Sequence, residues 1–453
     1  MASSRLVAET SIFHGGTVVA LDGAGTVRRA DIRVEDGVLR AIGGPFDEPG
    51  AQRVDCTGAL VLPGFVQTHV HLSQALFRGL AEEADLLLWL SRKIWPLEAA
   101  HDAASLVASA RLGLAEMVRT GTTTICDMGA MAHADVLAET VEASGVRAVV
   151  SRLLMDQGDG VPAALVEPAE RGLADARRLS ERFDGAGGGR LRVALAPRFV
   201  LSCSRELLAA VAQRSRDTGC LVHTHLNESK NEMAATERAL GRGAVSYFDE
   251  LGLLSERFVA AHGVWLSAEE RATLAARGAR LTHCPSANLK LASGVCDAKA
   301  LLDAGITVGL GADGIPCNNR ADAFEEMRLA GLLSRYLHGE SGLSSERIVR
   351  MATIEGARAL GLDALTGSIE VGKRADLVVV DATGTGGTVL AGGDLYDALV
   401  YQMSAERVRA VCADGRLLFA DGELRFAREA DVVADAERER GSLARRAGIH
   451  AAS

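Results

Sequence analysis

The chain has 453 residues, of which 48% are hydrophobic and 24% charged, an ordinary globular composition that excludes a disordered or fibrous protein. Its 49 basic and 59 acidic residues give a net charge of −10, which argues against a nucleic-acid partner bound through the overall electrostatic field. We find no apolar run of about 18 residues and no basic, apolar start, so we expect neither a membrane span nor a signal peptide.

Short strands are predicted at both ends of the chain, where Asp-Gly turns lie between apolar runs, a pattern typical of hairpins. The four clearest runs are Thr17–Leu21, Asp31–Val34, Ala375–Val380 and Val408–Ala413. We expect one small β domain built from residues 1–61 and 369–426. The tail, 427–453, contains a charged, Ala-rich helix over Glu429–Arg446 that we interpret as solvated.

Residues 62–368 alternate apolar strand patterns with amphipathic helices such as Ala103–Arg119 and Glu206–Arg216. The eight predicted strands are Leu60–His69, Thr122–Asp127, Val146–Arg152, Leu191–Arg198, Leu221–His225, Phe258–His262, Arg280–Cys284 and Thr307–Asp313. Strands that alternate with helices indicate parallel βα units, and eight such units favour a closed α/β barrel of the (β/α)8, TIM-like type. An open doubly wound sheet is the alternative, but no GxGxxG motif follows the early strands.

Histidines and a carboxylate fall at the ends of these strands, the rim on which barrel active sites are built. His69 and His71 are two residues apart, so in an extended strand both imidazoles face the same way and can bind one metal ion. The alternative is a pair of buried histidines bonded to backbone. His225 and Asp313 end two further strands and complete a plausible set for one divalent ion. His223, two residues before His225, is a further candidate ligand. Such an ion lowers the pKa of its water to about 7.

One more residue is placed to move protons. Glu228 follows His225 in the loop after its strand, where a carboxylate could pass protons to a leaving group. Its alternative is a helix N-terminal glutamate favoured by the dipole.

The eight cysteines form no CxxC pair, which favours reduced thiols and a cytoplasmic protein. Cys284 and Cys317 lie near the rim without a Cys-His-Asn pattern, so we interpret them as packing residues or as support for the site.

The motifs together resemble the amidohydrolase superfamily, in its cytosine deaminase and chlorohydrolase-like branch. They run in order through the chain and comprise Pro63–His71, Thr120–Thr124, His225–Glu228, Ala261–Gly263, His283–Gly294, Gly311–Gly314 and Gly367–Val378. The resemblance covers about residues 10 to 425. It implies a distorted barrel with a small composite β-sandwich and a mononuclear metal site.

The resemblance also implies roles for individual residues. The ligands of one divalent ion, zinc or less expectedly iron, would be His69, His71, His225 and Asp313. Glu228 would be the proton shuttle, Asp313 would also take a proton from the metal's water, and His262 would steady the hydroxide or the tetrahedral intermediate. Arg198 stands where binuclear relatives carry a bridging lysine, which favours one metal. The implied activity is hydrolysis of a carbon–nitrogen bond in a cyclic amidine, with release of ammonia from an aminated heteroaromatic ring.

One sub-branch that the chain resembles deaminates 5′-deoxyadenosine, methylthioadenosine and S-adenosylhomocysteine. The matching segments are Leu76–Glu82, Pro96–Glu98, Ser286–Leu291, Asn318–Asn319 and Phe324–Ala330. In that sub-branch the position of Glu98 holds ribose hydroxyls, and Arg152 would meet a carboxylate on the longer substrate. A second arginine expected within 156–167 is missing, which counts against S-adenosylhomocysteine.

A second resemblance, to guanine deaminases, rests on His71–Gln74 and Pro197–Ser204. There Gln74 and Arg198 would bond an oxopurine; otherwise Gln74 caps a helix and Arg198 pairs with an acid. We favour an adenosine-type nucleoside as the substrate. The alternatives are a guanine, 8-oxoguanine or pterin deaminase, a triazine amino- or chlorohydrolase, and a non-catalytic scaffold of the same fold. Proteins with these motifs are commonly dimers or larger, so we expect a homo-oligomer.

Overall fold

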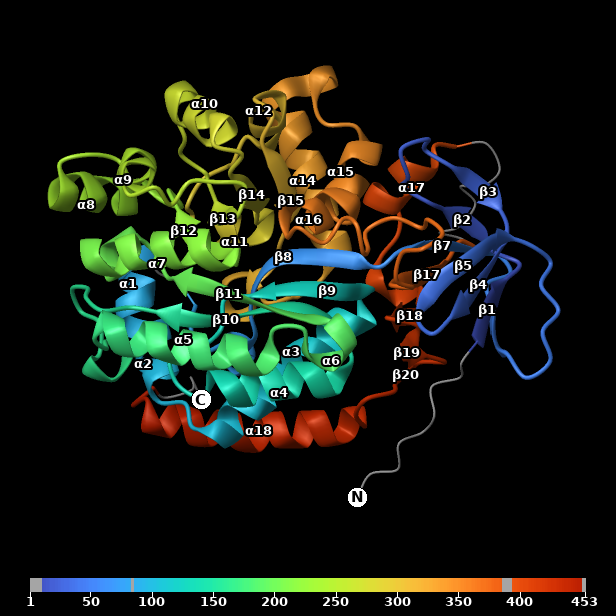
Figure 1. Ribbon diagram of the computed structural model, residues 1–453, viewed down its shortest axis with the longest axis horizontal. Coiled ribbons are helices and arrows are strands. Elements are labelled where there is room, and N and C mark those ends of the chain that lie inside the picture. Colours follow the sequence, from blue (N-terminus) through green and yellow to red (C-terminus); the bar gives the residue numbers. More distant parts are fainter. Residues whose placement is uncertain (1–9, 83–84, 385–392, 450–453) are drawn as a thin grey trace.

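The structure is a computed structural model that describes residues 10–82, 85–384 and 393–449. A large barrel carries a smaller β-rich body at one end, built from the blue and red ends of the chain (Figure 1). None of the described helices combines the length and the apolar character needed to cross a bilayer. Residues 1–9, where a signal peptide would begin, lie outside the described residues.

The barrel consists of parallel strands in sequential order, and β15 pairs with β8 to close it. This confirms the predicted (β/α)8 architecture. The strands are β8 (Phe65–His71), β9 (Thr122–Asp127), β10 (Arg147–Leu154), β11 (Leu191–Pro197), β12 (Val222–Leu226), β13 (Phe258–His262), β14 (Arg280–His283) and β15 (Thr307–Leu310). A short strand, β16 (Asp313–Gly314), also pairs with β8.

The predicted strand Leu60–His69 is wrong as a single element, because the structure divides it between two sheets. β7 (Ala59–Pro63) belongs to the small body, and β8 begins the barrel. Gly64 lies at the break, where a Cβ atom would come within 2.1 Å of Thr123 Cγ2. Only glycine allows this close approach, so the chain can leave one sheet and enter the next within one residue.

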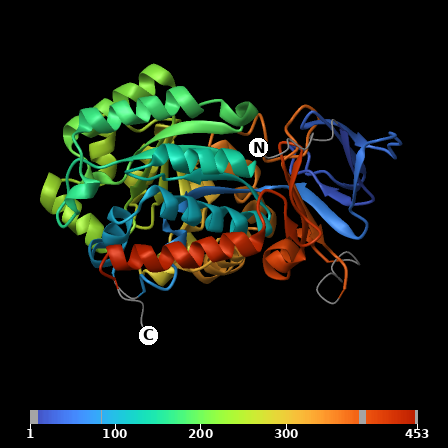
Figure 2. The same cartoon turned by 90° about the horizontal axis from the view of Figure 1, so that it is seen from below.

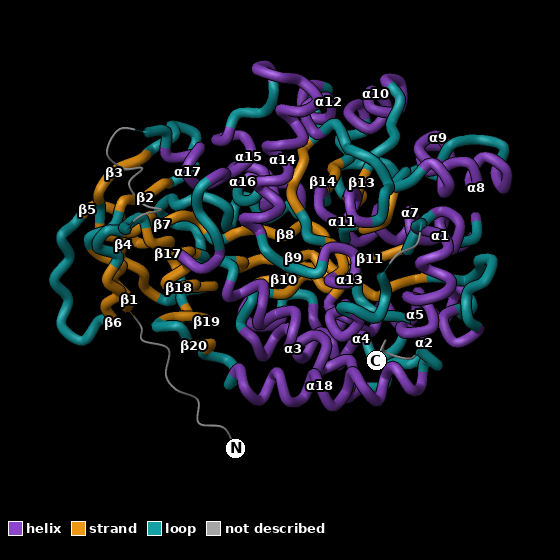
Figure 3. Tube along the Cα trace, turned by 180° about the vertical axis from the view of Figure 1, so that it is seen from behind, coloured by secondary structure: helices purple, strands orange, loops and turns teal. Residues whose placement is uncertain are grey.

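Helices surround the barrel and connect its strands (Figure 3). Those within the barrel sequence are α1 (Leu86–Trp89), α2 (Trp95–Ala99), α3 (Ala103–Arg119), α4 (Ala134–Ser144), α5 (Ala169–Phe183), α6 (Ala186–Gly189), α7 (Arg205–Thr218), α8 (Lys230–Leu240), α9 (Ala244–Glu250), α10 (Ala268–Ala276), α11 (Pro285–Lys290), α12 (Ala298–Asp303), α13 (Ile315–Asn318), α14 (Ala323–His338), α15 (Ser345–Met351) and α16 (Ile354–Ala359). A π-helical turn over Leu90–Ile94 joins α1 to α2.

The C-terminal helix α18 (Glu429–Arg446) has the predicted bounds but is not merely solvated. It lies along α3 on the outside of the barrel (Figure 2). Four side chains on its inner face are buried: Val432, Ala436, Leu443 and Ala444. The solvated interpretation is therefore wrong for this face, because the helix covers apolar surface with one side and exposes its charges on the other.

The small body contains two sheets and confirms the composite β domain predicted from both ends of the chain. In the larger sheet β7 pairs with the C-terminal strand β17, so the two ends meet directly. Its strands are β2 (Thr17–Val19), β3 (Val27–Arg29), β7, β17 (Leu377–Asp381), β18 (Val408–Ala413), β19 (Arg416–Ala420) and β20 (Glu423–Leu424), with helix α17 (Leu395–Tyr401). The other sheet holds β1 (Thr10–His14), β4 (Asp31–Glu35), β5 (Val38–Gly43) and β6 (Gln52–Asp55). The boundaries after residues 61, 368 and 426 stay predictions.

A buried ion pair joins the small body to the barrel. Arg147, at the start of β10, donates to both oxygens of Asp376 at 2.6 and 3.2 Å, and to Asp414 at 3.1 Å. The side chains of Arg147 and Asp376 are 2% and 0% exposed. Both charged groups are shielded from solvent, so each needs the opposite charge of the other to offset the cost of its burial.

Candidate active site

Three histidines and one aspartate converge at the carboxyl end of the barrel strands. His69 and His71 project from β8 to the same side, His225 comes from β12 and Asp313 from β16. The Nε2 atoms of His69 and His71 lie 3.0 and 3.3 Å from Asp313 Oδ1, and the Nε2 atoms of His71 and His225 are 3.3 Å apart. The four candidate ligands that the sequence predicted are thus within 4.8 Å of one another.

These separations fit a small divalent ion. Nitrogen and oxygen ligands at roughly 2.0–2.1 Å from a tetrahedral zinc ion lie about 3.3 Å from one another. Burial lowers the pKa of His69 to about 4, although Asp313 opposes the shift. Burial alone would raise the pKa of Asp313, but hydrogen bonds from His69 and His71 hold it well below its usual value. Burial also holds the pKa of His225 well below its usual value, so His69 and His225 are neutral and Asp313 is ionised, the forms that bind metal.

Two residues of the site hold unusual backbone conformations. His262 has φ 77° and Asp313 has φ 64°, in the left-handed region that residues with a side chain adopt rarely. Asp313 is paired through β16 with Val70, between the two histidines of β8. Such strain costs of order 1–3 kcal/mol per residue and is found mostly where function requires a fixed side-chain direction.

A buried nitrogen without a partner marks the space where a reacting group would lie. His262 Nδ1 is 2.9 Å from Asn288 Oδ1, whereas its Nε2 has no hydrogen-bond partner among the described residues. That Nε2 is 3.6 Å from Glu228 Oε2 and 3.9 Å from Asp313 Oδ2. A buried polar group left unpaired is costly, so this arrangement fits a bound water or substrate atom between the three side chains.

Glu228 is held in place by the turn that leads from β12 to α8. Ser229 and Glu232 form a capping box at the start of α8, and Glu232 Oε2 accepts the backbone N–H of Glu228 at 2.7 Å. The capping glutamate of α8 is therefore Glu232 and not Glu228. Ser293 donates to Glu228 Oε1 at 3.3 Å. Burial, with the negative charge of Asp313, raises the pKa of Glu228 to about 8, so its carboxyl can hold a proton at neutral pH.

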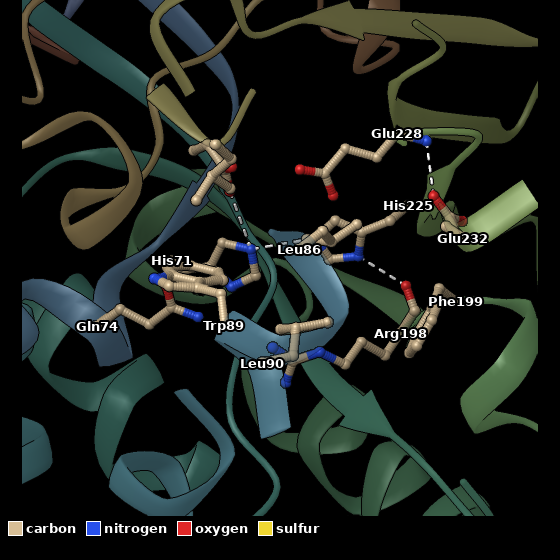
Figure 4. Close-up of a pocket in the computed structure, with 12 residues that line it drawn as sticks. His71, Gln74, Leu86, Trp89, Leu90, Arg198, Phe199, His225, Glu228 and Glu232 are labelled. Carbon is tan, nitrogen blue, oxygen red and sulfur yellow. Dashed lines mark hydrogen bonds and ion pairs between the residues drawn. The ribbon is translucent and has the colours of Figure 1, made fainter. Parts of the chain in front are cut away.

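A pocket opens from this centre, and both polar and apolar side chains line it (Figure 4). The residues that line it are His71, Gln74, Leu86, Trp89, Leu90, Arg198, Phe199, His225, Glu228, Glu232, Leu291 and Asp313. The apolar wall comes from α1 and the π-helical turn after it. A flat aromatic ring placed here would contact apolar side chains while its edge faced polar groups, a common design for heterocycle sites.

The predicted substrate-binding residues Gln74, Arg198 and Glu98 form one connected group. Gln74 and Arg198 line the pocket, and Glu98 lies behind them. Glu98 accepts Gln74 Nε2 at 2.9 Å with one oxygen and Arg198 Nη1 at 2.6 Å with the other. Its side chain is 8% exposed. The structure therefore joins residues that had suggested two different substrates, and Arg198 does pair with an acid.

Arg152 is placed elsewhere. Its guanidinium bonds to Glu167 at 2.5 Å and lies 3.7 Å from Asp175 on α5. It lines a separate surface cavity and is absent from the wall of the pocket described above. The structure does not bring Arg152 together with the other candidate residues.

Several supporting residues were not singled out in the sequence. Asn288 holds His262 and Ser293 holds Glu228, and both lie in the segment that follows β14. Cys317 Sγ lies 3.1 Å from Asp313 Oδ2, in line with the supporting role considered for it. The motif His283–Gly294 pointed to this segment, but no spacing rule shows which of its side chains faces which ligand.

The chain belongs to the amidohydrolase family: residues 60–418 match the sequence profile described as "Amidohydrolase family". The 5′-deoxyadenosine deaminase of Methanothermobacter thermautotrophicus is 39% identical over 91% of this chain and 95% of its own length. The 5-methylthioadenosine/S-adenosylhomocysteine deaminase of Haloarcula marismortui is 36% identical, over 93% of this chain and 96% of that protein. A crystal structure of an adenosine deaminase from Xanthomonas campestris with bound zinc superimposes with a TM-score of 0.88 and 31% identity, covering 95% and 98% of the two chains.

Proposed function

We propose that this chain is a deaminase that hydrolyses the exocyclic C–N bond of adenosine-type nucleosides, with 5′-deoxyadenosine or methylthioadenosine as the best candidates, and uses one zinc ion per subunit. The observation that carries the proposal is His262 Nε2, which has no hydrogen-bond partner among the described residues and faces Glu228 and Asp313. It lies beside the group formed by His69, His71, His225 and Asp313. The names of the similar deaminases, and the zinc in the similar structure, support it.

The ligand set and the three facing side chains suggest a division of tasks. His69, His71, His225 and Asp313 would hold the ion. When bound, a divalent ion supplies hydroxide near neutral pH by lowering the pKa of water to about 7. Asp313 Oδ2, which points toward His262, can take a proton from the attacking water. Water adds to the ring carbon that bears the amino group. The proton taken up by Asp313 then passes to the amino group, ammonia leaves, and the added hydroxyl gives its proton back to Glu228 as the ring carbon becomes a carbonyl.

Glu228 and His262 act on the substrate side. Because burial raises its pKa to about 8, the Glu228 carboxyl can hold a proton and deliver it to the ring nitrogen next to the reacting carbon. His262 Nε2 lies on the other side of the same space and would hold the incoming oxygen, while Asn288 fixes the ring of His262 through Nδ1. The apolar wall of Leu86, Trp89 and Leu90 limits access of bulk water.

A second candidate, an oxopurine deaminase, is favoured by one observation. Gln74 and Arg198 face the pocket, whereas Glu98, the candidate for ribose, lies behind them. A carbonyl at the ring edge would suit an arginine that is always charged. Adenosine-type substrates remain our first choice because the 39% and 36% identical deaminases extend over nearly the whole chain.

The test is ammonia release by zinc-supplemented protein on 5′-deoxyadenosine and on guanine, measured side by side. We expect release from the nucleoside, and its loss in His69→Ala, which removes a ligand. Release from guanine alone would reverse the ranking of the two candidates. No release from either, with zinc retained, would move the search to pterins and triazines, and a protein that never holds metal would support a scaffold.

Two further expectations belong to this proposal. We propose that the protein forms a homo-oligomer, which a native mass measurement tests. We also propose a cytoplasmic location, supported by eight cysteines that are all free. A disulfide found in protein purified without reducing agent would count against it.

A further inference from the structure

A line of three buried side chains lies behind the first metal-binding histidine. His69 Nδ1 is 2.9 Å from His223 Nε2, and His223 Nδ1 is 3.2 Å from Cys126 Sγ. The three residues come from β8, β12 and β9 and are 0%, 0% and 1% exposed. His223 was a candidate ligand in the sequence, but both of its nitrogens face these neighbours rather than the ligand group.

The other ligand histidines have no such line. His225 Nδ1 lies 2.7 Å from the backbone carbonyl of Arg198, an acceptor that every residue at that position would provide. His71 Nδ1 has no partner within the described part of the chain. Of the three, His69 alone has its outer nitrogen bonded to another side chain, so its orientation depends on the identity of residue 223.

Metal binding would fix a direction along this line, because it would replace the hydrogen bond between His69 Nε2 and Asp313. His69 Nε2 faces the ligand group, so it must be without a proton to bind metal, and the proton of the neutral ring then sits on Nδ1. Nδ1–H donates to His223 Nε2, which must accept. The proton of His223 is therefore on Nδ1 and points to Cys126 Sγ, which accepts in turn. One chain of donors and acceptors sets the tautomer of the metal ligand.

We propose that His223 is a positioning residue that holds His69 in its metal-binding tautomer and orientation, and that Cys126 completes the line by accepting from His223. The inference rests on the metal site of the proposed function, although it does not depend on which ring is deaminated. Outer partners of metal-binding histidines typically affect metal affinity about 10–100-fold. Because the line lies on the side of His69 away from the pocket, it acts on the metal and not on the substrate.

The test compares two substitutions at residue 223 and measures zinc affinity by competition with a chromophoric chelator. His223→Leu removes the acceptor, and we expect zinc affinity to fall about 10–100-fold. His223→Gln keeps a carbonyl that can accept from His69 Nδ1, and it should recover most of that loss. The absorption spectrum of the cobalt-substituted protein should shift in the leucine variant, and KM for the nucleoside at saturating zinc should stay unchanged.

Substitutions of cysteine keep the test valid should His223→Leu not fold. Cys126→Val should weaken zinc binding and Cys126→Ser, which keeps an acceptor, should not. Cys412→Val is the matched control, since Cys412 is wholly buried in β18 of the small body and should leave zinc affinity unchanged.

Three results would overturn the proposal. The first is wild-type zinc affinity in folded His223→Leu and Cys126→Val. The second is equal loss of affinity in the leucine and glutamine variants, which would indicate packing alone. The third is equal loss in Cys412→Val. A wild-type protein that binds zinc but deaminates nothing would end the proposed function and leave this inference standing, whereas a wild-type protein that binds no zinc would end both.

Discussion

The proton-transfer role of Glu228 is tested most directly by Glu228→Gln, which keeps the shape of the side chain but cannot release a proton. Glu228 is outside the four-residue ligand group, and its Oε2 lies 3.6 Å from His262 Nε2. Burial and the negative charge of Asp313 raise the pKa of this carboxyl to about 8, whereas an ordinary glutamate is almost fully ionised at pH 7. The wild-type residue is therefore ready to donate.

The expected magnitude follows from that chemistry. Losing a positioned acid or base lowers kcat about 10²–10⁴-fold, which corresponds to ~2.7–5.4 kcal/mol of transition-state stabilisation. The assay is ammonia release from saturating 5′-deoxyadenosine, with zinc content measured on the same samples. Zinc content should not change, because the substituted group is not a ligand.

Glu232→Gln is the matched control four residues away. Glu232 is also buried, and burial with the charge of Glu228 raises its pKa to about 7, but its oxygen accepts backbone N–H groups at the start of α8. A glutamine there still accepts, so kcat should fall by less than about tenfold, since no proton-transfer group is lost. The reasoning is refuted by Glu228→Gln protein that keeps its zinc and retains kcat within tenfold of wild type. Loss of zinc in that variant would instead refute the assignment of Glu228 to a position outside the metal ligand group.

Three other predictions concern the metal, the sugar and the joint between the two bodies. Chelation of the wild type, His69→Ala and Asp313→Ala should each cause loss of both the bound metal and the activity. Added zinc should restore activity only in the chelated wild type, and a variant that is active without metal would refute the proposed metal site. Glu98→Ala should raise KM for nucleosides far more than for free bases, whereas equal effects would mean that Glu98 only positions its neighbours. Arg147→Met strands the buried Asp376 and should lower the free energy of unfolding by roughly 3–5 kcal/mol at pH 7 in denaturant titrations. Burial would raise the pKa of Asp376, but Arg147 holds it below its usual 3.8. The stabilisation is therefore present above pH 3.8 and is lost as the pH falls through the lowered pKa. The same difference in unfolding free energy between wild type and Arg147→Met at pH 3 and at pH 7 would contradict this prediction.

Much of the fold could be predicted because its signals are local. The strands Thr122–Asp127 and Phe258–His262 and the helix Ala103–Arg119 have the predicted bounds. In each, the spacing of apolar residues and the flanking turn or cap residues predict the type of element and place its ends to within a few positions. Leu60–His69 was misread as one strand because apolar residues lie on both sides of Pro63-Gly64, and their pattern does not show that Gly64 carries the chain from one sheet to another.

The candidate ligands could also be named from the sequence, since parallel strands bring their carboxyl ends to one rim. Knowing that His69, His225 and Asp313 end strands was enough to expect them together. The family resemblance placed Arg152 near the substrate, and there the structure differs. It ends the predicted strand Val146–Arg152, but β10 continues to Leu154 and the side chain of Arg152 pairs with Glu167.

The sequence by itself determined the barrel, the composite β body and the identities of the residues that could bind metal. Only the tertiary structure decided that Glu98 lies behind Gln74 and Arg198, and that His223 and Cys126 support His69. The physical reason is the separation along the chain between the residues that interact. Periodicity and strand ends depend on neighbours along the chain, whereas the direction of a buried polar side chain is set by hydrogen-bond partners that lie on other strands and can be more than a hundred residues away.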